Sequence, residues 1–120
     1  MRKEINSEEI DNLRRGFKRC GHEVVEAIIR YRMDHDATLI PAIALGVVRR
    51  YLHQEYRPVL DQATEQMPLA ALEVDSLTML EIVLDLQEVF DITIENAELK
   101  NLQTLGDMLG ILREKAAPEP

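Results

Sequence analysis

The sequence has few residues that could stabilise a fold through disulfides or a bound metal, so its fold must depend on a hydrophobic core. Its 120 residues include one cysteine, Cys20, and no tryptophan. A lone cysteine excludes an intramolecular disulfide and a cysteine-based metal site, and the three histidines lack the spacing of metal ligands. The core must therefore come from Leu, Ile, Val, Ala and Met side chains, which is typical of a helical bundle without a metal.

Long hydrophobic runs are also absent from the sequence. No stretch is long enough to cross a bilayer, and the N-terminus has no signal-peptide pattern. The length suits one domain with a modest core. We therefore expect a soluble, cytoplasmic protein that does not insert into membranes.

Basic residues are scarce in the second half of the chain. Residues 1–58 carry 11 Lys and Arg against 9 Asp and Glu, a net charge of +2, whereas residues 59–120 carry 3 against 13, a net charge of −10. No Lys or Arg lies between Glu73 and Lys100. The acidic half should repel nucleic acid and attract partners with basic surfaces.

Helical periodicity dominates the N-terminal third. Ser7 is followed by two glutamates, which is typical of a helix start. Gly16 and Gly21 interrupt the apolar stripe behind it, so one kinked helix or two short helices broken near Gly21 would satisfy the pattern. The polar segment 34–38 predicts a turn. The stripe recurs at steps of three or four: Ile10, Leu13, Phe17, Cys20, Val24, Ile28 and Tyr31.

The middle of the chain predicts one helix and one long connection. The helix is expected to begin with Thr38 as its cap, to accept Pro41 in its first turn, and to end before Pro58. Residues 58–75 show no clear period, which predicts a long ordered loop.

Three helical segments follow. A helix is predicted from Ser76 to about Phe90, and residues 96–102 predict a short helical turn. Thr104, with Asp107 three residues on, resembles a capping box that opens the last helix. No strand alternation occurs, so the predicted fold class is all-α.

The helix that begins at Ser76 has two different faces. One is broadly apolar, and the other carries the acids Glu81, Asp85 and Glu88 in a narrow stripe. Like charges at this spacing repel one another. The stripe is therefore either a solvated face or a docking surface for basic partners.

Ser76 has three interpretations. As a structural residue, Ser76 could be the N-cap of the helix, or Asp75 could be the N-cap with Ser76 in the first turn. A catalytic nucleophile needs an adjacent base, and no sequence signature of one is present. Modification by another protein suits the position, because free backbone N–H groups and the helix dipole stabilise a phosphate there.

The stretch "VDSLTMLEIVLDLQEVFDITI" resembles the attachment-site motif of acyl carrier proteins and related phosphopantetheine-binding domains. The match comprises the D-S-L triplet and the residues Glu81, Leu86, Phe90, Ile92 and Ile94, and it continues through Leu102 and Thr104. The resemblance implies that Ser76 carries a 4′-phosphopantetheine arm as a phosphodiester. It also implies that a phosphopantetheinyl transferase recognises Asp75, Ser76 and Leu77.

The resemblance further implies where partners and cargo bind. Enzymes with basic surfaces, of the ketosynthase, dehydratase and acyltransferase types, would dock on the acidic helix. Its partner-binding residues would be Glu81, Asp85 and Glu88. A short or medium acyl chain would shelter among Leu80, Leu84, Phe90 and Ile94.

Three features depart from the family pattern. Glu73 replaces a glycine and Ala71 replaces an acid just before the motif, and Thr78 stands where many members carry an acid. Residues 1–36 lie outside the resemblance. This segment could pack its basic cluster on the acidic half, mediate dimerisation or partner docking, or simply complete the core with an extra helix.

We therefore expect a four-helix acyl-carrier-like bundle with an additional N-terminal helix or helices. The predicted organisation is an N-terminal helical extension (1–36), an acyl carrier domain (37–115) and a flexible tail (116–120). The protein would be a carrier without catalytic activity, a monomer or weak dimer, serving fatty-acid or polyketide biosynthesis. The alternatives are an unmodified acidic adaptor that keeps the carrier fold, or, less favoured, a hydrolase that uses Ser76.

Overall fold

The computed structural model describes residues 5–116, and all regular structure in that range is helical apart from one isolated antiparallel bridge between Pro68 and Thr104. Four short 3₁₀ segments precede or join the α-helices: Lys18–Cys20, Ala37–Leu39, Gln54–Tyr56 and Leu69–Leu72. The all-α prediction is confirmed. The α-helices are α1 (Ser7–Gly16), α2 (His22–Asp34), α3 (Ile40–Tyr51), α4 (Arg57–Asp61), α5 (Ser76–Phe90), α6 (Asn96–Leu99) and α7 (Leu105–Lys115).

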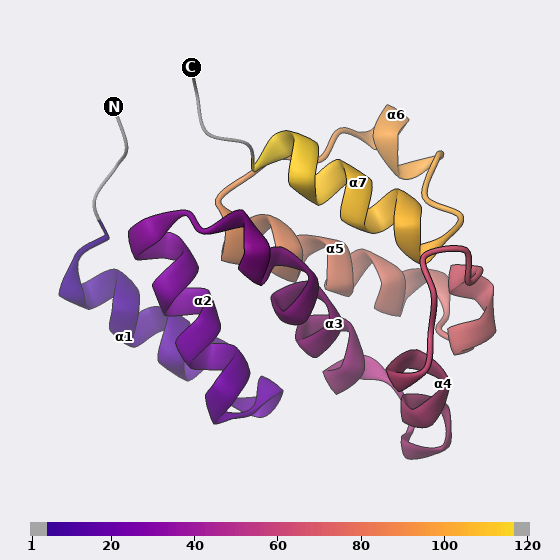
Figure 1. Cartoon of the computed structure of the whole chain (residues 1–120), viewed down its shortest axis with the longest axis horizontal. Helices are drawn as coiled ribbons and strands as arrows, with labels where there is room; N and C mark the ends of the chain where they lie inside the picture. Colours follow the sequence, from indigo (N-terminus) through magenta and orange to yellow (C-terminus); the bar gives the residue numbers. More distant parts are fainter. Residues whose placement is uncertain (1–4, 117–120) are drawn as a thin grey trace.

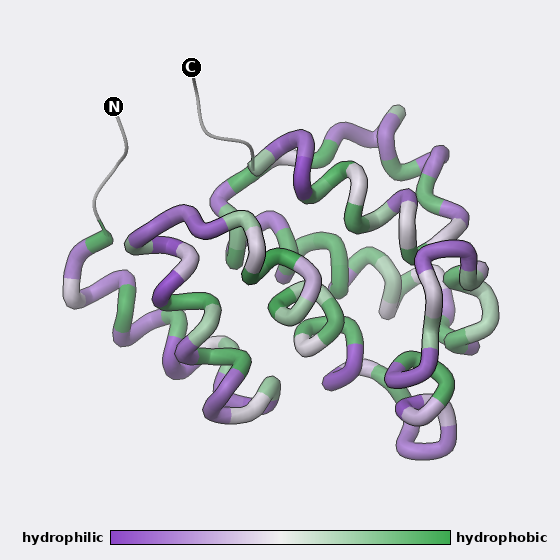
Figure 2. Tube along the Cα trace, in the orientation of Figure 1, coloured by the Kyte–Doolittle hydropathy of each residue, from purple (hydrophilic) through white to green (hydrophobic). Residues whose placement is uncertain are grey.

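The helices surround one hydrophobic core. Figure 1 shows α1 and α2 as a hairpin at one end of the molecule, α4 near the other end, and α3, α5 and α7 between them. The buried residues of α2, α3, α5 and α7 belong to a single cluster, and Figure 2 shows apolar segments on the inner sides of these helices. The core is therefore continuous from the N-terminal hairpin to the last helix.

The N-terminal hairpin completes this core. Phe17 and Tyr31 are both 1% exposed, and the ring of Tyr31 meets the ring of Phe90 in α5 edge-on, with centroids 5.1 Å apart. The Arg32 guanidinium donates to the backbone oxygen of Glu88 at 3.2 Å. Of the three roles considered for residues 1–36, completion of the core is the one that these contacts display.

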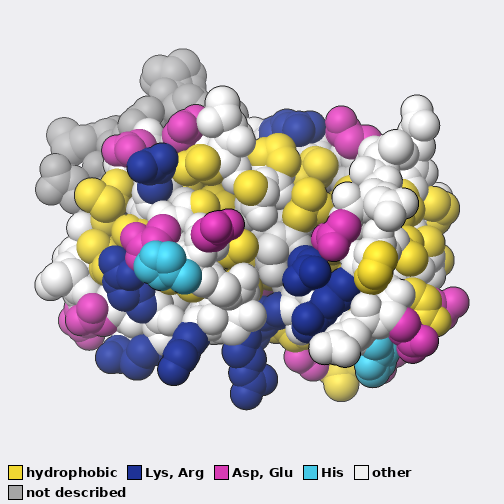
Figure 3. All heavy atoms as spheres, turned by 60° about the horizontal axis from the view of Figure 1, so that its bottom comes forward, with side chains coloured by type: hydrophobic (Ala, Val, Ile, Leu, Met, Phe, Trp, Pro, Cys, Tyr) yellow, Lys and Arg dark blue, Asp and Glu magenta, His cyan; other side chains and the backbone are white. Residues whose placement is uncertain are grey.

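The basic cluster of the hairpin does not bind the acidic half. Arg14 pairs with Glu26 in α2, and Arg15 donates to Asn12 within α1. Within residues 5–116, no ion pair links Arg14, Arg15, Lys18 or Arg19 to residues after position 58. Lys and Arg side chains instead gather on one exposed face of the molecule (Figure 3).

The first helix begins at Ser7, as predicted, whereas the predicted cap of the helix in the middle of the chain is wrong. Ser7 is the first residue of α1, but the cap is Asn6, whose side chain accepts from the Glu9 N–H at 2.8 Å. Thr38 does not cap α3; it lies in the 3₁₀ turn Ala37–Leu39 and donates to Asp36 through its N–H and hydroxyl groups. The Asp36 carboxylate accepts both bonds and caps this 3₁₀ turn, and α3 begins at Ile40 without a side-chain cap.

Gly21 separates α1 from α2, which agrees with the alternative of two short helices broken near this residue. Its φ of 97° and ψ of 156° belong to a region that side chains rarely adopt. A continuous helix through this position is therefore excluded, and α2 begins at His22.

The prediction of a loop over residues 58–75 is wrong in part. Pro58 does not follow a helix; it lies in the first turn of α4, where its missing N–H costs no hydrogen bond. The preceding helix α3 already ends at Tyr51. The part of the segment after α4 contacts the start of α7, where the N–H of Gly106 donates a hydrogen bond to the Glu65 backbone oxygen at 2.7 Å.

The capping box of the last helix is confirmed. The Thr104 hydroxyl accepts from the Asp107 N–H at 3.1 Å, and the Asp107 carboxylate accepts from the Thr104 N–H at 3.0 Å. Backbone N–H groups that donate to this carboxylate lower the pKa of Asp107. Ala116 caps the end of α7, and the remaining predicted tail, residues 117–120, lies outside the described residues.

Candidate functional site

Ser76 is the first residue of α5, and Asp75 is its cap. The Asp75 carboxylate accepts from the Thr78 N–H at 2.7 Å, and this bond lowers the pKa of Asp75 below its usual value. The Ser76 side chain is exposed and has no hydrogen-bond partner among residues 5–116. Of the two capping alternatives, the one with Asp75 as cap is confirmed.

The backbone around Ser76 is suited to an anion. The N–H groups of Ser76 and Leu77 belong to the first turn of a 15-residue helix and have no partner within the described residues. Such groups carry the positive end of the helix dipole. A phosphodiester on the Ser76 oxygen would lie beside them, so the residues present fit a phosphopantetheine group.

A hollow of about 280 Å³ adjoins Ser76. Its lining, here called the serine hollow, comprises Leu69, Ala70, Val74, Asp75, Ser76 and Met79. Asp75 is the only titratable residue of this lining, and its carboxylate already accepts the capping bond. No lining residue forms a hydrogen bond with the Ser76 hydroxyl, whereas a hydrolase mechanism at Ser76 would require an adjacent base.

The four residues predicted to line an acyl pocket do not lie together in the structure. Leu80 and Leu84 are 46% and 54% exposed, so they do not line an interior; Phe90 and Ile94 are buried toward the far end of α5. The reason is that α3 and α2 cover the other side of α5, which leaves Leu80 and Leu84 on its outer side. Sequence reasoning missed Leu69, Ala70 and Val74, because these residues lie in the segment without helical period.

The outer side of α5 is more apolar than the sequence predicted. It carries the leucine–glutamate face, defined by the exposed residues Leu77, Leu80, Glu81, Leu84 and Glu88. These positions follow the spacing of one helix face. Glu81 and Glu88 therefore lie with three exposed leucines, of which Leu77 is 66% exposed.

Asp85 does not belong to the leucine–glutamate face. Its side chain is 19% exposed, forms an ion pair with Arg50 at 3.4 Å, and accepts a hydrogen bond from the Tyr51 hydroxyl. Burial and the bond to Asp85 raise the pKa of Tyr51 above its usual value. The charge of Asp85 is thus used inside the molecule, which corrects its prediction as a partner-binding residue.

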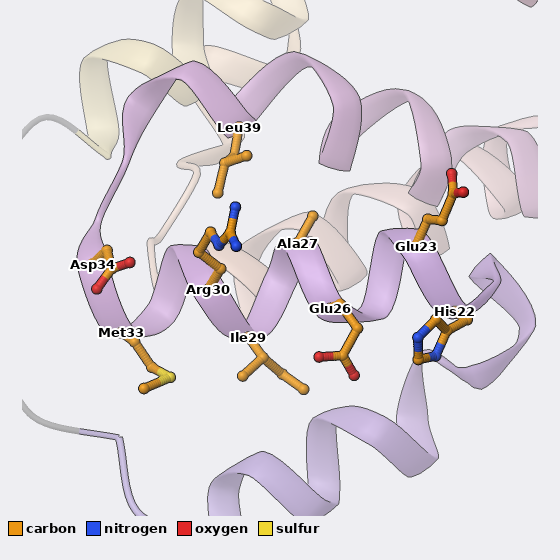
Figure 4. Close-up of a pocket in the computed structure, with 9 residues that line it drawn as sticks. All are labelled: His22, Glu23, Glu26, Ala27, Ile29, Arg30, Met33, Asp34 and Leu39. Carbon is orange, nitrogen blue, oxygen red and sulfur yellow. The ribbon is translucent and has the colours of Figure 1, made fainter.

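A second hollow, of about 560 Å³, lies on the outer side of α2. Figure 4 shows its side chains along that helix, among them His22, Glu26 and Arg30, together with Leu39 from the following segment. No residue of α5 lines this hollow. Across residues 5–116, no group of three or more His, Cys, Asp or Glu side chains could hold a metal ion, and no helix there is long and apolar enough to span a membrane.

Comparison with known proteins places the chain in a family. A family model described as "Phosphopantetheine attachment site" matches residues 49–112, which is more than half of the chain. The chain therefore belongs to the phosphopantetheine attachment-site family, and the group attached in that family is phosphopantetheine. The match contains the serine hollow, α5 and most of α7.

Several curated relatives carry the name acyl carrier protein. One from Exiguobacterium sibiricum is 44% identical over 41 residues, which is 34% of this chain and 52% of the relative. One from Acidothermus cellulolyticus is 42% identical over 50 residues (42% and 60%), and an acyl carrier protein homolog from Mycoplasma genitalium is 40% identical over 50 residues (42% and 60%). The chain thus spans between half and two thirds of the length of these relatives, which are named as carriers and not as enzymes. No solved structure matches the chain.

Proposed function

We propose that this protein is an acyl carrier protein whose Ser76 bears 4′-phosphopantetheine and whose cargo is held as a thioester on that arm. The observation that carries the proposal is the state of the Ser76 hydroxyl: exposed, without a hydrogen bond among the described residues, and relieved of capping by Asp75. The hydroxyl oxygen is available for a new bond. The family match and the names of the relatives support the same assignment.

Attachment requires a separate phosphopantetheinyl transferase. The Ser76 oxygen bonds to the phosphorus of the phosphopantetheine portion of coenzyme A, the bond to the nucleotide portion breaks, and the hydroxyl proton passes to the transferase. The chain's own contribution is to present the oxygen and to stabilise the resulting anion with the free N–H groups of the first turn of α5. Asp75 and Leu77 flank the oxygen and would be read by the transferase.

The serine hollow would receive the start of the arm or of a short acyl chain. Leu69, Val74 and Met79 offer an apolar wall directly beside Ser76, so burial of CH₂ groups there would stabilise the loaded state by about 0.8 kcal/mol per group. This assignment replaces Leu80 and Leu84 as cargo contacts. Phe90 and Ile94 stay predictions as deeper parts of a cargo site.

Partner enzymes would dock on the face formed by Leu77, Leu80, Glu81, Leu84 and Glu88. Two exposed glutamates favour a basic partner surface, and three exposed leucines add an apolar contact that salt does not screen. Docking should therefore depend less on ionic strength than a three-acid stripe would. We propose a pathway of fatty-acid or polyketide type, with partners such as ketosynthases, dehydratases and acyltransferases.

We further propose that residues 37–115 form the carrier domain and that residues 1–36 are a helical extension that completes its core. The family match over residues 49–112 supports a carrier unit that contains α5 and most of α7. Cytoplasmic location and a monomeric or weakly dimeric state stay predictions.

The experiment is intact mass spectrometry after incubation with coenzyme A and a broad-specificity phosphopantetheinyl transferase. The wild-type chain is expected to gain one phosphopantetheine, and Ser76→Ala none. Ser7→Ala is a matched control, because Ser7 is the other serine of the chain and is likewise the exposed first residue of a helix behind an Asx cap. An unmodified wild-type chain would instead support the adaptor alternative.

A further inference from the structure

Four arginines converge on a small hollow away from Ser76. The arginine hollow, of about 180 Å³, is lined by Arg19, Cys20, Val24, Gly46, Arg49, Arg50 and Arg57. These residues come from the 3₁₀ turn Lys18–Cys20, from α2, from the second half of α3 and from the first residue of α4.

The floor of the hollow is a close contact between two helices. A Cβ atom at Gly46 would lie 2.5 Å from a Val24 methyl group. The absence of a side chain at Gly46 therefore lets α2 and α3 approach closely, and both helices belong to the same core. The arginine hollow is thus bounded by packed elements and not by a single loop.

Only part of the positive charge is neutralised within the molecule. Arg49 pairs with Asp61 at 3.1 Å, and Arg50 pairs with Asp85 and also donates to the Gly16 oxygen at 3.2 Å. The hollow contains no Asp or Glu among its lining residues. Burial raises the pKa of the Cys20 thiol despite the nearby Arg50, so the thiol adds no negative charge at neutral pH.

Arg19 and Arg57 are left without an acid. Neither guanidinium forms an ion pair with any residue from 5 to 116. The Nε atom of Arg57 is also buried and lacks a hydrogen-bond partner. A buried donor without an acceptor is costly, and in native proteins such a group usually has a partner in water or an ion.

We propose that the arginine hollow binds a phosphate group. The two uncompensated guanidiniums match the charge of nearly −2 that a phosphomonoester carries at neutral pH, and their planar N–H groups suit its oxygens. The volume equals the space of about six water molecules, enough for a phosphate with part of its ester. The source is either inorganic phosphate or a small phosphomonoester.

This site is distinct from the proposed attachment point. Asp85, the α5 residue that pairs with Arg50, follows Ser76 by nine residues, which places it about 13 Å farther along the helix axis. Phosphate binding here does not rest on modification of Ser76. The proposal can therefore be tested on unmodified protein, and its failure would leave the function at Ser76 untouched.

The test is a nuclear magnetic resonance titration of ¹⁵N-labelled full-length protein that follows backbone amides and arginine Nε–H groups. Inorganic phosphate is added in one arm and sn-glycerol 3-phosphate in the other, with chloride adjusted to hold ionic strength constant. We expect saturable shifts at Arg57 Nε–H and at the amides of residues 18–20, with half-saturation at about 1 mM or below. Tighter binding in the second arm would identify an ester as the ligand, and equal or tighter binding in the first arm would identify inorganic phosphate.

Three variants separate a built site from diffuse attraction. Arg57→Gln and Arg19→Gln should each weaken binding about tenfold. Arg15→Gln removes the same charge from an exposed arginine of the hairpin that does not line the hollow, and it should bind as the wild type does. Arg19 is exposed, so its variant is informative even if Arg57→Gln unfolds. Shifts that do not saturate, or equal weakening in all three variants, would overturn the proposal.

Discussion

Glu73 occupies a backbone conformation that a glycine would adopt at lower cost. It caps the 3₁₀ segment Leu69–Leu72 with φ of 54° and ψ of 41°, in the left-handed region. Its N–H donates to the Ala70 oxygen at 3.2 Å. Carrier proteins of the resembling pattern have glycine at this position, and the left-handed conformation explains that preference physically. We predict that Glu73→Gly stabilises the protein.

The magnitude follows from two opposing terms. The left-handed conformation costs a residue with a Cβ atom about 1–2 kcal/mol, and glycine removes that cost. Glycine also has more freedom in the unfolded chain, which returns about 0.5–1 kcal/mol. The Glu73 side chain is exposed and forms no ion pair among the described residues, so its removal costs no such contact. The free energy of unfolding should rise by about 0.5–1 kcal/mol, and Tm by about 2–4 °C.

Urea denaturation of Glu73→Gly, Glu73→Ala and the wild type measures this effect. Alanine removes the same carboxylate but keeps the Cβ atom, so Glu73→Ala should gain nothing comparable. The reasoning would be refuted if the alanine variant were as stable as the glycine variant, because the gain would then come from the lost charge. The midpoint should move without a change in slope, since the exposed surface stays the same.

Three further predictions concern the packing and caps that hold the site. Gly106→Ala should destabilise the protein by about 1–3 kcal/mol, because its Cβ would lie 2.8 Å from the Glu65 backbone oxygen; unchanged stability in urea would contradict this. Tyr31→Ala should cost about 3–5 kcal/mol, since the ring is buried against Phe90; a near-wild-type midpoint would mean that the hairpin is not part of the core. Asp107 has a lowered pKa in the folded state, so its stabilising bond is fully present above its unfolded pKa of about 3.9 and is lost as pH falls through the folded value; Asp107→Asn should show a smaller loss of stability below about pH 4, measured by thermal unfolding between pH 2 and 6.

Sequence and structure agree best where the determinants are local. The capping box of Thr104 and Asp107 was predicted because both partners lie within three residues, and its bonds form as expected. The break at Gly21 was one of two stated alternatives for the same reason. The wrong cap at Thr38 and the missed helix α4 show the limit of this approach. Thr38 bonds to Asp36 instead of capping α3, and α4 has a proline in its first turn.

In the candidate site, too, the local features could be predicted from the sequence and the contacts between distant residues could not. Asp75 and Ser76 could be recognised in the sequence as the start of a helix and as the core of an attachment motif. The pairing of Asp85 inside the molecule could not be recognised in the sequence, because its partners Arg50 and Tyr51 lie 34 or more residues away. The apolar wall beside Ser76 was missed because Leu69 and Val74 carry no periodic signal.

The sequence by itself determined the helical class of this protein, the helix that starts at Ser76 and the family to which that helix belongs. These depend on propensities, caps and motif spacing that act within a few residues. The tertiary structure alone decided which side of α5 faces solvent, where the serine hollow lies and which residues meet in the arginine hollow. Each of those features requires side chains from distant segments to pack together, and such contacts are set by the shape of the whole core.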